Sequence, residues 1–444
     1  MRLRELSAAA ALVALASAAP ACRTAAPPAG PPEPAALAPV TAPTVAPAAK
    51  PDGIDQPRAA ALTRKIMEAV ARARALPITG EVQVEVRRRS EIRELAKTSM
   101  YEHNTAEQIR LFTRIEASMG VLPLGADGEK VLLDMLETGV MGVYEPKIKT
   151  LLIGTHVAES MLDMVVGHEI AHGLQDMHFD LKRLQQPIRG DSDAESARTY
   201  LVEGDAQAAY LAWVAGDRGL GSIDDAVFLA TGNQALDLAD FADHPVLARS
   251  LQLPYADGAA TVARLVRERG WSAVDALYKE LPTTTEQMLH LDKLLAREPA
   301  VHVTIDDAAV AARLPGHRVV WQDNVGEASF LAMLADVEPA PVARAAAAGW
   351  GGDRYLALDT VPPGPAPLIV GQVVFDSEAD AAEFEPIFRA YLEKKLPTTH
   401  LLERRKAGLL YATQLHDEPT RAAVAAAWPA FTAGAPQRPA RAAK

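Results

Sequence analysis

Two histidines spaced four residues apart, His168 and His172, form the pair with the clearest chemical meaning in this sequence. On an α-helix, positions i and i+4 lie one above the other on a single face, so both imidazoles can reach one metal ion. Neutral imidazole is a favoured zinc ligand, and a catalytic site needs a third protein ligand and a free position for water. Glu169 follows the first histidine, and its carboxylate can take a proton from a zinc-bound water. This H-E-x-x-H pattern therefore predicts a Zn²⁺ site in which Glu169 is the catalytic base.

The motif also arises by chance, so its surroundings decide how much it means. Uncharged residues fill and flank it: Val165, Val166, Ile170, Ala171 and Leu174. A helix that is apolar on most of its faces is expected to be buried. Because buried polar groups need partners, this setting favours a metal site over an ordinary pair of core histidines beside a solvent-facing glutamate.

Glu203, 31 residues after His172, is the predicted third ligand. It lies in a predicted helix among apolar neighbours, where an unpaired charge is costly. The rival is His178, whose spacing from His172 matches the metzincin motif. That motif needs a glycine three residues after the second histidine to turn the chain out of the helix, and Gln175 occupies this position. The sequence therefore favours a ligand set of His168, His172 and Glu203.

Stretches spread over most of the chain resemble a little-characterised group of exported bacterial and archaeal zinc-peptidase-like proteins. They comprise residues 142–146, 168–181, 202–206, 253–255, 258, 270–275, 284–290 and 349–353. More broadly, the chain is similar to the gluzincins, the thermolysin-like zincins whose third zinc ligand is a glutamate. The resemblance implies a zincin-like fold, an edge strand that binds substrate beside the metal helix, and hydrolysis of a peptide or protein substrate.

One position departs from the gluzincin pattern. Gluzincins commonly carry an aspartate four residues after the ligand glutamate, where it hydrogen-bonds a ligand histidine, but this chain has Gln207 there. Outer hydrogen bonds of this kind orient the metal ligands. Asp176 and Asp205 are the alternative partners that the sequence offers.

A zinc peptidase also needs a group that steadies the oxyanion. His290, in a cluster of Thr, Glu, Gln and His, is the catalytic residue predicted for this role. The alternative is that it simply lies on a helix that begins with a capping box formed by Thr283 and Glu286. Tyr144 and Tyr255 are further candidates, and Tyr144 equally suits ordinary packing in a hairpin.

The elements that must position these residues follow from the hydrophobic pattern. Apolar runs predict buried helices at 158–177 and 193–215, which carry the histidines and the third ligand. Alternating valines predict a strand at 82–86, and the apolar runs at 140–144 and 150–154 around a proline turn predict a β-hairpin. One further helical segment is predicted over 90–116, among others.

Together these elements predict an α+β fold in two parts. The first, at 58–298, is a zincin-like metallopeptidase region that is mostly helical with a small sheet. The second, at 299–432, is a small α+β domain, because its elements follow the β-α-β-β-α-β order of a split βαβ arrangement.

The N-terminal segment predicts export. In residues 1–21, Arg2 and Arg4 precede an apolar run that is typical of a signal peptide. Cys22, the single cysteine, follows small residues as in bacterial lipoprotein signals, and the alternative is an ordinary cleavage site that happens to precede a cysteine. Residues 22–57, rich in alanine and proline, predict an extended tether, and residues 433–444 predict a disordered tail.

These features place the protein outside the cytoplasm, lipid-anchored through Cys22 in the bacterial cell envelope. The formal net charge of −12 argues against a nucleic-acid partner, whose phosphates would be repelled.

Two other functions fit the same sequence. One is a catalytically silent zincin-fold lipoprotein that acts as a binding or assembly factor in the envelope, and the other is a structural helical protein with a chance motif.

Overall fold

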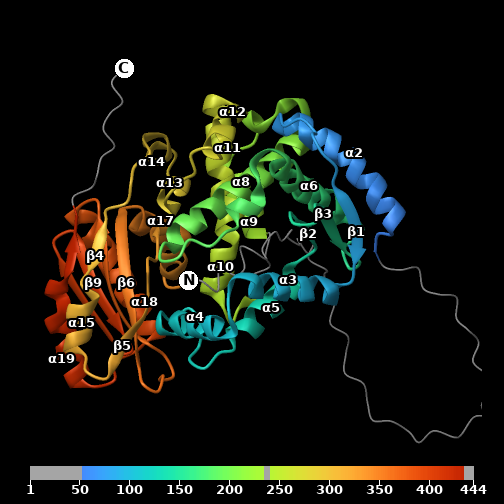
Figure 1. The fold of residues 1–444 in the computed structure, drawn as a ribbon. Coiled ribbons are helices and arrows are strands. Elements are labelled where there is room, and N and C mark those ends of the chain that lie inside the picture. Colours follow the sequence, from blue (N-terminus) through green and yellow to red (C-terminus); the bar gives the residue numbers. More distant parts are fainter. Residues whose placement is uncertain (1–52, 235–240, 435–444) are drawn as a thin grey trace, which may run out of the picture.

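The computed structural model describes residues 53–234 and 241–434 (Figure 1). These residues form an α+β fold, as predicted, with helices dominating the first part and a five-stranded sheet in the second. The predicted signal peptide, Cys22, most of the tether and most of the predicted disordered tail lie outside the described residues. Among the described helices, none is long and apolar enough to span a membrane.

A three-stranded sheet stands beside the helices of the first part. It consists of β1 (Gln83–Arg87), β2 (Gly142–Glu145) and β3 (Thr150–Gly154) in the order β1-β3-β2. Strands β2 and β3 are antiparallel and form the predicted hairpin, while β1 pairs with β3 in parallel. Strand β2 therefore ends the sheet on the side of helix α6 (Leu162–Phe179), which packs against it.

Helix α8 (Ser192–Ala215) crosses α6 and is the second predicted buried helix. Two glycines let its backbone approach the π-helical segment η5 (Pro254–Gly258) closely. A Cβ on Gly204 would collide with the backbone of Gly258, and a Cβ on Gly258 would lie 2.5 Å from the carbonyl oxygen of Tyr200. Only residues without a side chain fit this crossing.

The remaining helices of the first part surround this pair (Figure 1). They are α2 (Gln56–Arg74), α3 (Arg89–His103), α4 (Ala106–Ser118), α5 (Gly128–Gly139), α7 (Leu181–Leu184), α9 (Asp225–Gln234), α10 (Pro245–Leu253), α11 (Ala259–Arg269), α12 (Trp271–Leu277), α13 (Thr285–Leu289) and α14 (Leu291–Ala296), with 3-10 turns at Glu159–Met161, Gly216–Arg218 and Leu220–Ser222. The single helical segment predicted over 90–116 is two helices, α3 and α4. Thr105 starts the second of them with a capping box to Gln108, which interrupts the first.

The second part is built on an antiparallel sheet of five strands. The strands are β5 (His317–Asp323), β6 (Trp350–Thr360), β7 (Leu368–Phe375), β8 (His400–Arg405) and β9 (Gly408–Thr413), in the order β5-β6-β7-β9-β8. Helices α16 (Glu327–Leu334), α17 (Ala340–Ala347) and α18 (Glu378–Lys395) share a core with one face. Helices α15 (Asp307–Arg313) and α19 (Glu418–Ala427) share a core with the other. A short ribbon of β4 (Val303–Ile305) and β10 (Phe431–Ala433), with the 3-10 turn Trp428–Ala430, completes this part.

The predicted split βαβ topology is found in one half of this domain and is wrong for the other half. In that arrangement a third strand lies between the two strands that a helix connects. Strands β7 and β8, which α18 connects, fit it because β9 lies between them. Strands β5 and β6 are joined through α16 and α17 but are direct antiparallel neighbours, so this half does not. Strand β8 was also missing from the prediction, because its sequence ends in Glu403, Arg404 and Arg405 and lacks the apolar pattern of a buried strand.

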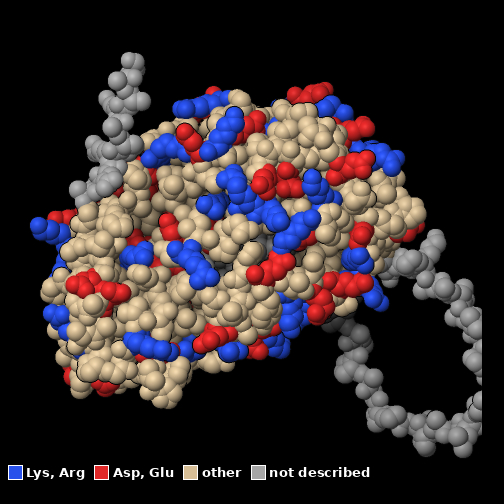
Figure 2. Space-filling model, in the orientation of Figure 1, with Lys and Arg blue, Asp and Glu red and all other residues tan. Residues whose placement is uncertain are grey.

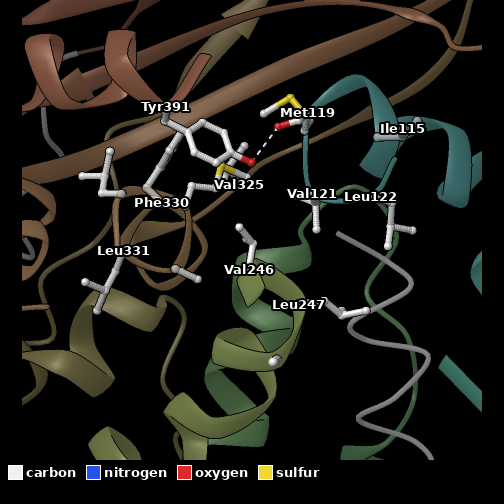
Figure 3. Packing of buried hydrophobic residues seen from close by; sticks show 14 of the residues in the cluster. Ile115, Met119, Val121, Leu122, Val246, Leu247, Val325, Phe330, Leu331 and Tyr391 are labelled. Carbon is white, nitrogen blue, oxygen red and sulfur yellow. Dashed lines mark hydrogen bonds between the residues drawn. The ribbon is translucent and has the colours of Figure 1, made fainter. Parts of the chain in front are cut away.

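One hydrophobic core runs across the predicted boundary at residue 298. It joins residues of α3 to α5 and α10 with residues of α16, α18 and the large sheet. Figure 3 shows this contact, where Met119 and Leu122 face Val246, Phe330 and neighbouring side chains. The Tyr391 hydroxyl donates a 3.0 Å hydrogen bond to the carbonyl oxygen of Met119 across the same contact. The two parts therefore pack as one body.

The surface carries both signs of charge. On the face that Figure 2 shows, basic and acidic side chains are interspersed, and no extended basic patch stands out. This distribution gives no electrostatic footprint for a nucleic acid on that face.

Candidate metal centre

The three predicted metal ligands meet in the interior of the first part. Helix α6 supplies His168 and His172, and α8 supplies Glu203. The Nε2 atoms of the two histidines are 3.1 Å apart, and Glu203 Oε2 lies 3.2 Å from the first and 3.3 Å from the second. Ligand atoms held at about 2.0–2.2 Å from one tetrahedral zinc ion would be about 3.3–3.6 Å apart. The triangle therefore has nearly the size that zinc requires.

The far sides of both imidazoles are held by amide oxygens. His168 Nδ1 lies 3.2 Å from Gln207 Oε1, and His172 Nδ1 lies 2.8 Å from Gln175 Oε1. An amide oxygen only accepts hydrogen bonds, so each Nδ1 carries the ring hydrogen and each Nε2 presents a lone pair. Two lone pairs facing each other at 3.1 Å repel unless a cation lies between them. The donor chemistry thus fits a metal ion as well as the distances do.

Glu169 is placed for the predicted role of base. It is fully buried, and its Oε2 accepts a 2.7 Å hydrogen bond from the backbone N–H of Tyr144 in β2. Its Oε1 is buried and has no hydrogen-bond partner among the described residues. Burial raises the pKa of Glu169 to about 8, and the nearby Glu203 carboxylate adds to this effect. A buried carboxylate with one unused oxygen is a strong sign that another group belongs there.

Strand β2 passes directly over α6. A Cβ on Gly142 would lie 2.7 Å from Val165 Cγ1 and 3.4 Å from Glu169 Cγ, so this position needs a glycine. Two residues later, the Tyr144 hydroxyl donates a 2.9 Å hydrogen bond to Asp176 Oδ2. Tyr144 and Asp176, proposed for the oxyanion and for the support of the histidines, are therefore bonded to each other.

The rival ligand His178 lies elsewhere. Helix α6 continues to Phe179, so the chain does not leave the helix at Gln175. The His178 ring extends toward the segment before β1, and its Nε2 lies 2.8 Å from the carbonyl oxygen of Pro77. The helical conformation at Gln175 agrees with the prediction that a chain without glycine there does not make the metzincin turn.

The candidates for the oxyanion role differ in their surroundings. His290 joins α13 to α14, and its Nε2 lies 2.8 Å from Glu327 Oε1 on α16. The helix before it is capped by Thr284, not by the predicted Thr283. Tyr255 is buried in η5, and its ring centroid lies 5.6 Å from that of His168. The contact with His168 therefore favours Tyr255 over His290 as a group near the proposed metal ligands.

A polar network centred on Asp205 lies behind Gln175, the residue that contacts His172. Asp205, fully buried two residues after Glu203, accepts hydrogen bonds from Arg74 Nε at 2.5 Å, Tyr278 Oη at 2.8 Å and Gln175 Nε2 at 3.0 Å. Arg74 is itself 1 % exposed, and it also pairs with Asp275 and stacks on Trp271. The predicted support from Asp205 thus reaches His172 through Gln175.

The comparisons with known proteins bear on the second part of the chain only. A protein-family model described as a domain of unknown function (DUF8575) matches residues 313–428. This stretch holds the five-stranded sheet with α16 to α19 and none of the proposed metal ligands. No curated protein and no solved structure matches the chain.

A second group of three acidic residues comes together at Glu286, Glu298 and Asp376. The Lys293 ammonium lies among them, 2.7 Å from Asp376 Oδ2 and 3.6 Å from Glu298 Oε1, and it also contacts Glu286. A lysine already supplies the positive charge that these carboxylates need. This group is an ion-pair cluster and not a second metal site.

Sequence reasoning missed the two glutamines that hold the histidines. Gln207 stood out only as a departure from the gluzincin pattern, although it takes the place of the expected aspartate. Gln175 was considered only as a residue that resists a turn. Its position three residues after His172 puts the two side chains on adjacent parts of one helix face, and that spacing was the available signal.

Proposed function

We propose that this protein is a zinc-dependent metallopeptidase in which His168, His172 and Glu203 hold the metal. One observation carries the proposal: ligand atoms from two buried helices converge within 3.3 Å, with both imidazoles fixed from behind. A bound zinc ion would supply a Lewis acid and lower the pKa of a coordinated water to about 7.

In this proposal Glu169 handles the protons. The N–H of Tyr144 fixes its Oε2, which leaves Oε1 to accept a proton from water and to return it to the leaving amine. Burial favours the protonated form of this carboxyl group, which makes it an effective donor in the second step. Tyr255 and His290 remain the two candidates for steadying the oxyanion, and contact with His168 favours Tyr255.

Strand β2 supports a peptide as the substrate. It ends the small sheet in the order β1-β3-β2 and is bonded to Glu169 of α6 through the N–H of Tyr144, so this edge lies beside the proposed base. An extended peptide can add to such an edge through backbone hydrogen bonds. The substrate strand would then pass over Glu169 and the ligand triangle.

Zinc content and hydrolysis of an unfolded protein substrate test the proposal. The purified chain should hold about one zinc ion, and His168→Ala should abolish binding. Glu169→Gln should keep the zinc and lower the hydrolysis rate by about 10²–10⁴-fold, because it removes the acid–base group alone. A chain without zinc contradicts the proposal.

One further outcome identifies an alternative function. Zinc binding without hydrolysis in the wild type would indicate the catalytically silent envelope factor, which the near-complete burial of the proposed ligands also suits.

Export and a lipid on Cys22 stay predictions of the sequence. Mass spectrometry of the N-terminal peptide checks both, and an unmodified Cys22 would contradict the lipid anchor.

A further inference from the structure

Asp205 controls the orientation of one amide beside the proposed metal centre. Its carboxylate, paired with Arg74, can only accept hydrogen bonds, and so can the carbonyl oxygen of Val202. Gln175 Nε2 donates to both, at 3.0 Å to Asp205 Oδ2 and at 2.9 Å to Val202. Both amide hydrogens of Gln175 are therefore used on the α8 side.

This arrangement dictates what Gln175 offers to His172. With its NH₂ group committed to α8, the amide must turn Oε1 toward the ring, where it lies 2.8 Å from Nδ1. The imidazole then carries its hydrogen on Nδ1 and turns the lone pair of Nε2 toward His168 and Glu203. The order of partners, from Asp205 to Gln175 to His172, leaves one consistent set of hydrogen positions.

We propose that Asp205 is a positioning residue that fixes the metal-binding tautomer of His172 through Gln175. The inference rests on the proposed metal centre and adds to it. In metal sites a carboxylate commonly accepts directly from a ligand histidine. Here an amide stands between the two, so the carboxylate acts one residue further away and leaves the histidine with a neutral partner.

Asp205→Asn is the decisive substitution. The new side chain has nearly the same shape, but its NH₂ group can donate to Gln175 Oε1. Only the carbonyl oxygen of Val202 then opposes a reversed Gln175 amide, which would present NH₂ to His172 and favour the tautomer with hydrogen on Nε2. Zinc affinity of the full chain, measured by competition with a chelator, should fall by about 10–100-fold, the scale found for outer partners of metal ligands.

A double-mutant cycle distinguishes this role from a purely structural one. Gln175→Met removes the relay and leaves Asp205 with Arg74 and Tyr278, and it should weaken zinc binding by a similar factor. Because both changes break one pathway, Asp205→Asn should have no further effect on zinc affinity in the Gln175→Met background. The melting temperature of the zinc-free chain should still fall with each change.

Two control variants remove other partners of the same network. Asp275→Asn weakens the second ion pair of Arg74, and Tyr278→Phe removes a hydrogen bond to Asp205. Each should lower the melting temperature while zinc affinity stays within about twofold, since neither touches Gln175.

Several results would overturn the inference. Asp205→Asn with wild-type zinc affinity would show that Asp205 acts on stability alone. Factors that multiply in the double mutant would show that Asp205 affects zinc binding by a route other than Gln175. If Asp205→Asn does not fold, Gln175→Met with wild-type zinc affinity is sufficient to reject the relay. A wild-type chain that binds no zinc overturns the metal centre itself, whereas a wild type that binds zinc confines the failure to Asp205.

Discussion

Two buried glutamates at the centre show how one residue type takes two roles. Burial alone would raise the pKa of Glu203, but the adjacent His172 and His168 lower it, which favours the anionic form that the proposed ligand role requires. Glu169 has a backbone N–H as its hydrogen-bond partner, and burial raises its pKa. Environments that separate two carboxyl groups in this way mark one for binding and one for proton transfer.

This difference predicts the result of replacing the third ligand. Glu203→Gln keeps the shape of the side chain and removes its charge, so zinc affinity should fall by at least about 10–100-fold. Chelator competition measures the change. His178→Ala is the matched control and should retain zinc, because that ring bonds to Pro77. Loss of zinc in the control with retention in Glu203→Gln would reverse the ligand assignment.

The motif made the residues of α6 predictable, but their partners depend on contacts between elements. His168, His172 and Glu169 follow from a local spacing that any helix converts into one face. Strand β1 and the hairpin were predictable for the same reason, since the alternating valines of the first and the two apolar runs of the second are local patterns. Which strands pair in the large sheet, and that Arg74 reaches Asp205 from 131 residues away, depend on tertiary packing that no local pattern contains.

The crossing of α8 over η5 predicts an effect of helix position on the centre. Gly204→Ala places a methyl group against the backbone of Gly258 and should cost about 1–3 kcal/mol of stability. It should also weaken zinc binding, because Glu203 is the adjacent residue on α8.

Thermal unfolding and zinc competition measure these two effects. Gly221→Ala is the control, since a Cβ there meets open space, and it should change neither quantity. Equal behaviour of the two variants would mean that the close approach of the backbones does not position the ligand.

The whole molecule is held together by more than the shared core. Asp323, at the end of β5, accepts from the backbone N–H of Ser192 at 2.9 Å and from its hydroxyl at 2.7 Å. Within the first part, Asp193 of α8 accepts from the backbone N–H of Thr285, the first residue of α13. Asn324 adds a bond to the N–H of Asp193. The first turn of α8, the helix that carries Glu203, is therefore held by hydrogen bonds to the second part of the protein.

Shared packing predicts one cooperative unfolding transition for both parts. Far-UV circular dichroism and tryptophan fluorescence should give the same midpoint, as two-state behaviour requires. Tyr391→Phe, which removes the hydrogen bond to Met119, should lower both midpoints together, at a cost of about 1 kcal/mol. Two separate transitions would show that the parts fold independently in spite of their contact.

Asp323, which caps the first N–H of α8 from the second part of the chain, also sets an order of events in biosynthesis. Ser192 and Asp323 are 131 residues apart in the chain. At roughly 5–20 residues per second, Asp323 is made on the order of ten seconds after the start of the helix that it caps. During that interval the nascent chain already contains all three proposed ligands but lacks the cap and the core contacts of the second part. The complete arrangement of the proposed site can therefore form only after the second part, which holds none of the proposed ligands, has been synthesised.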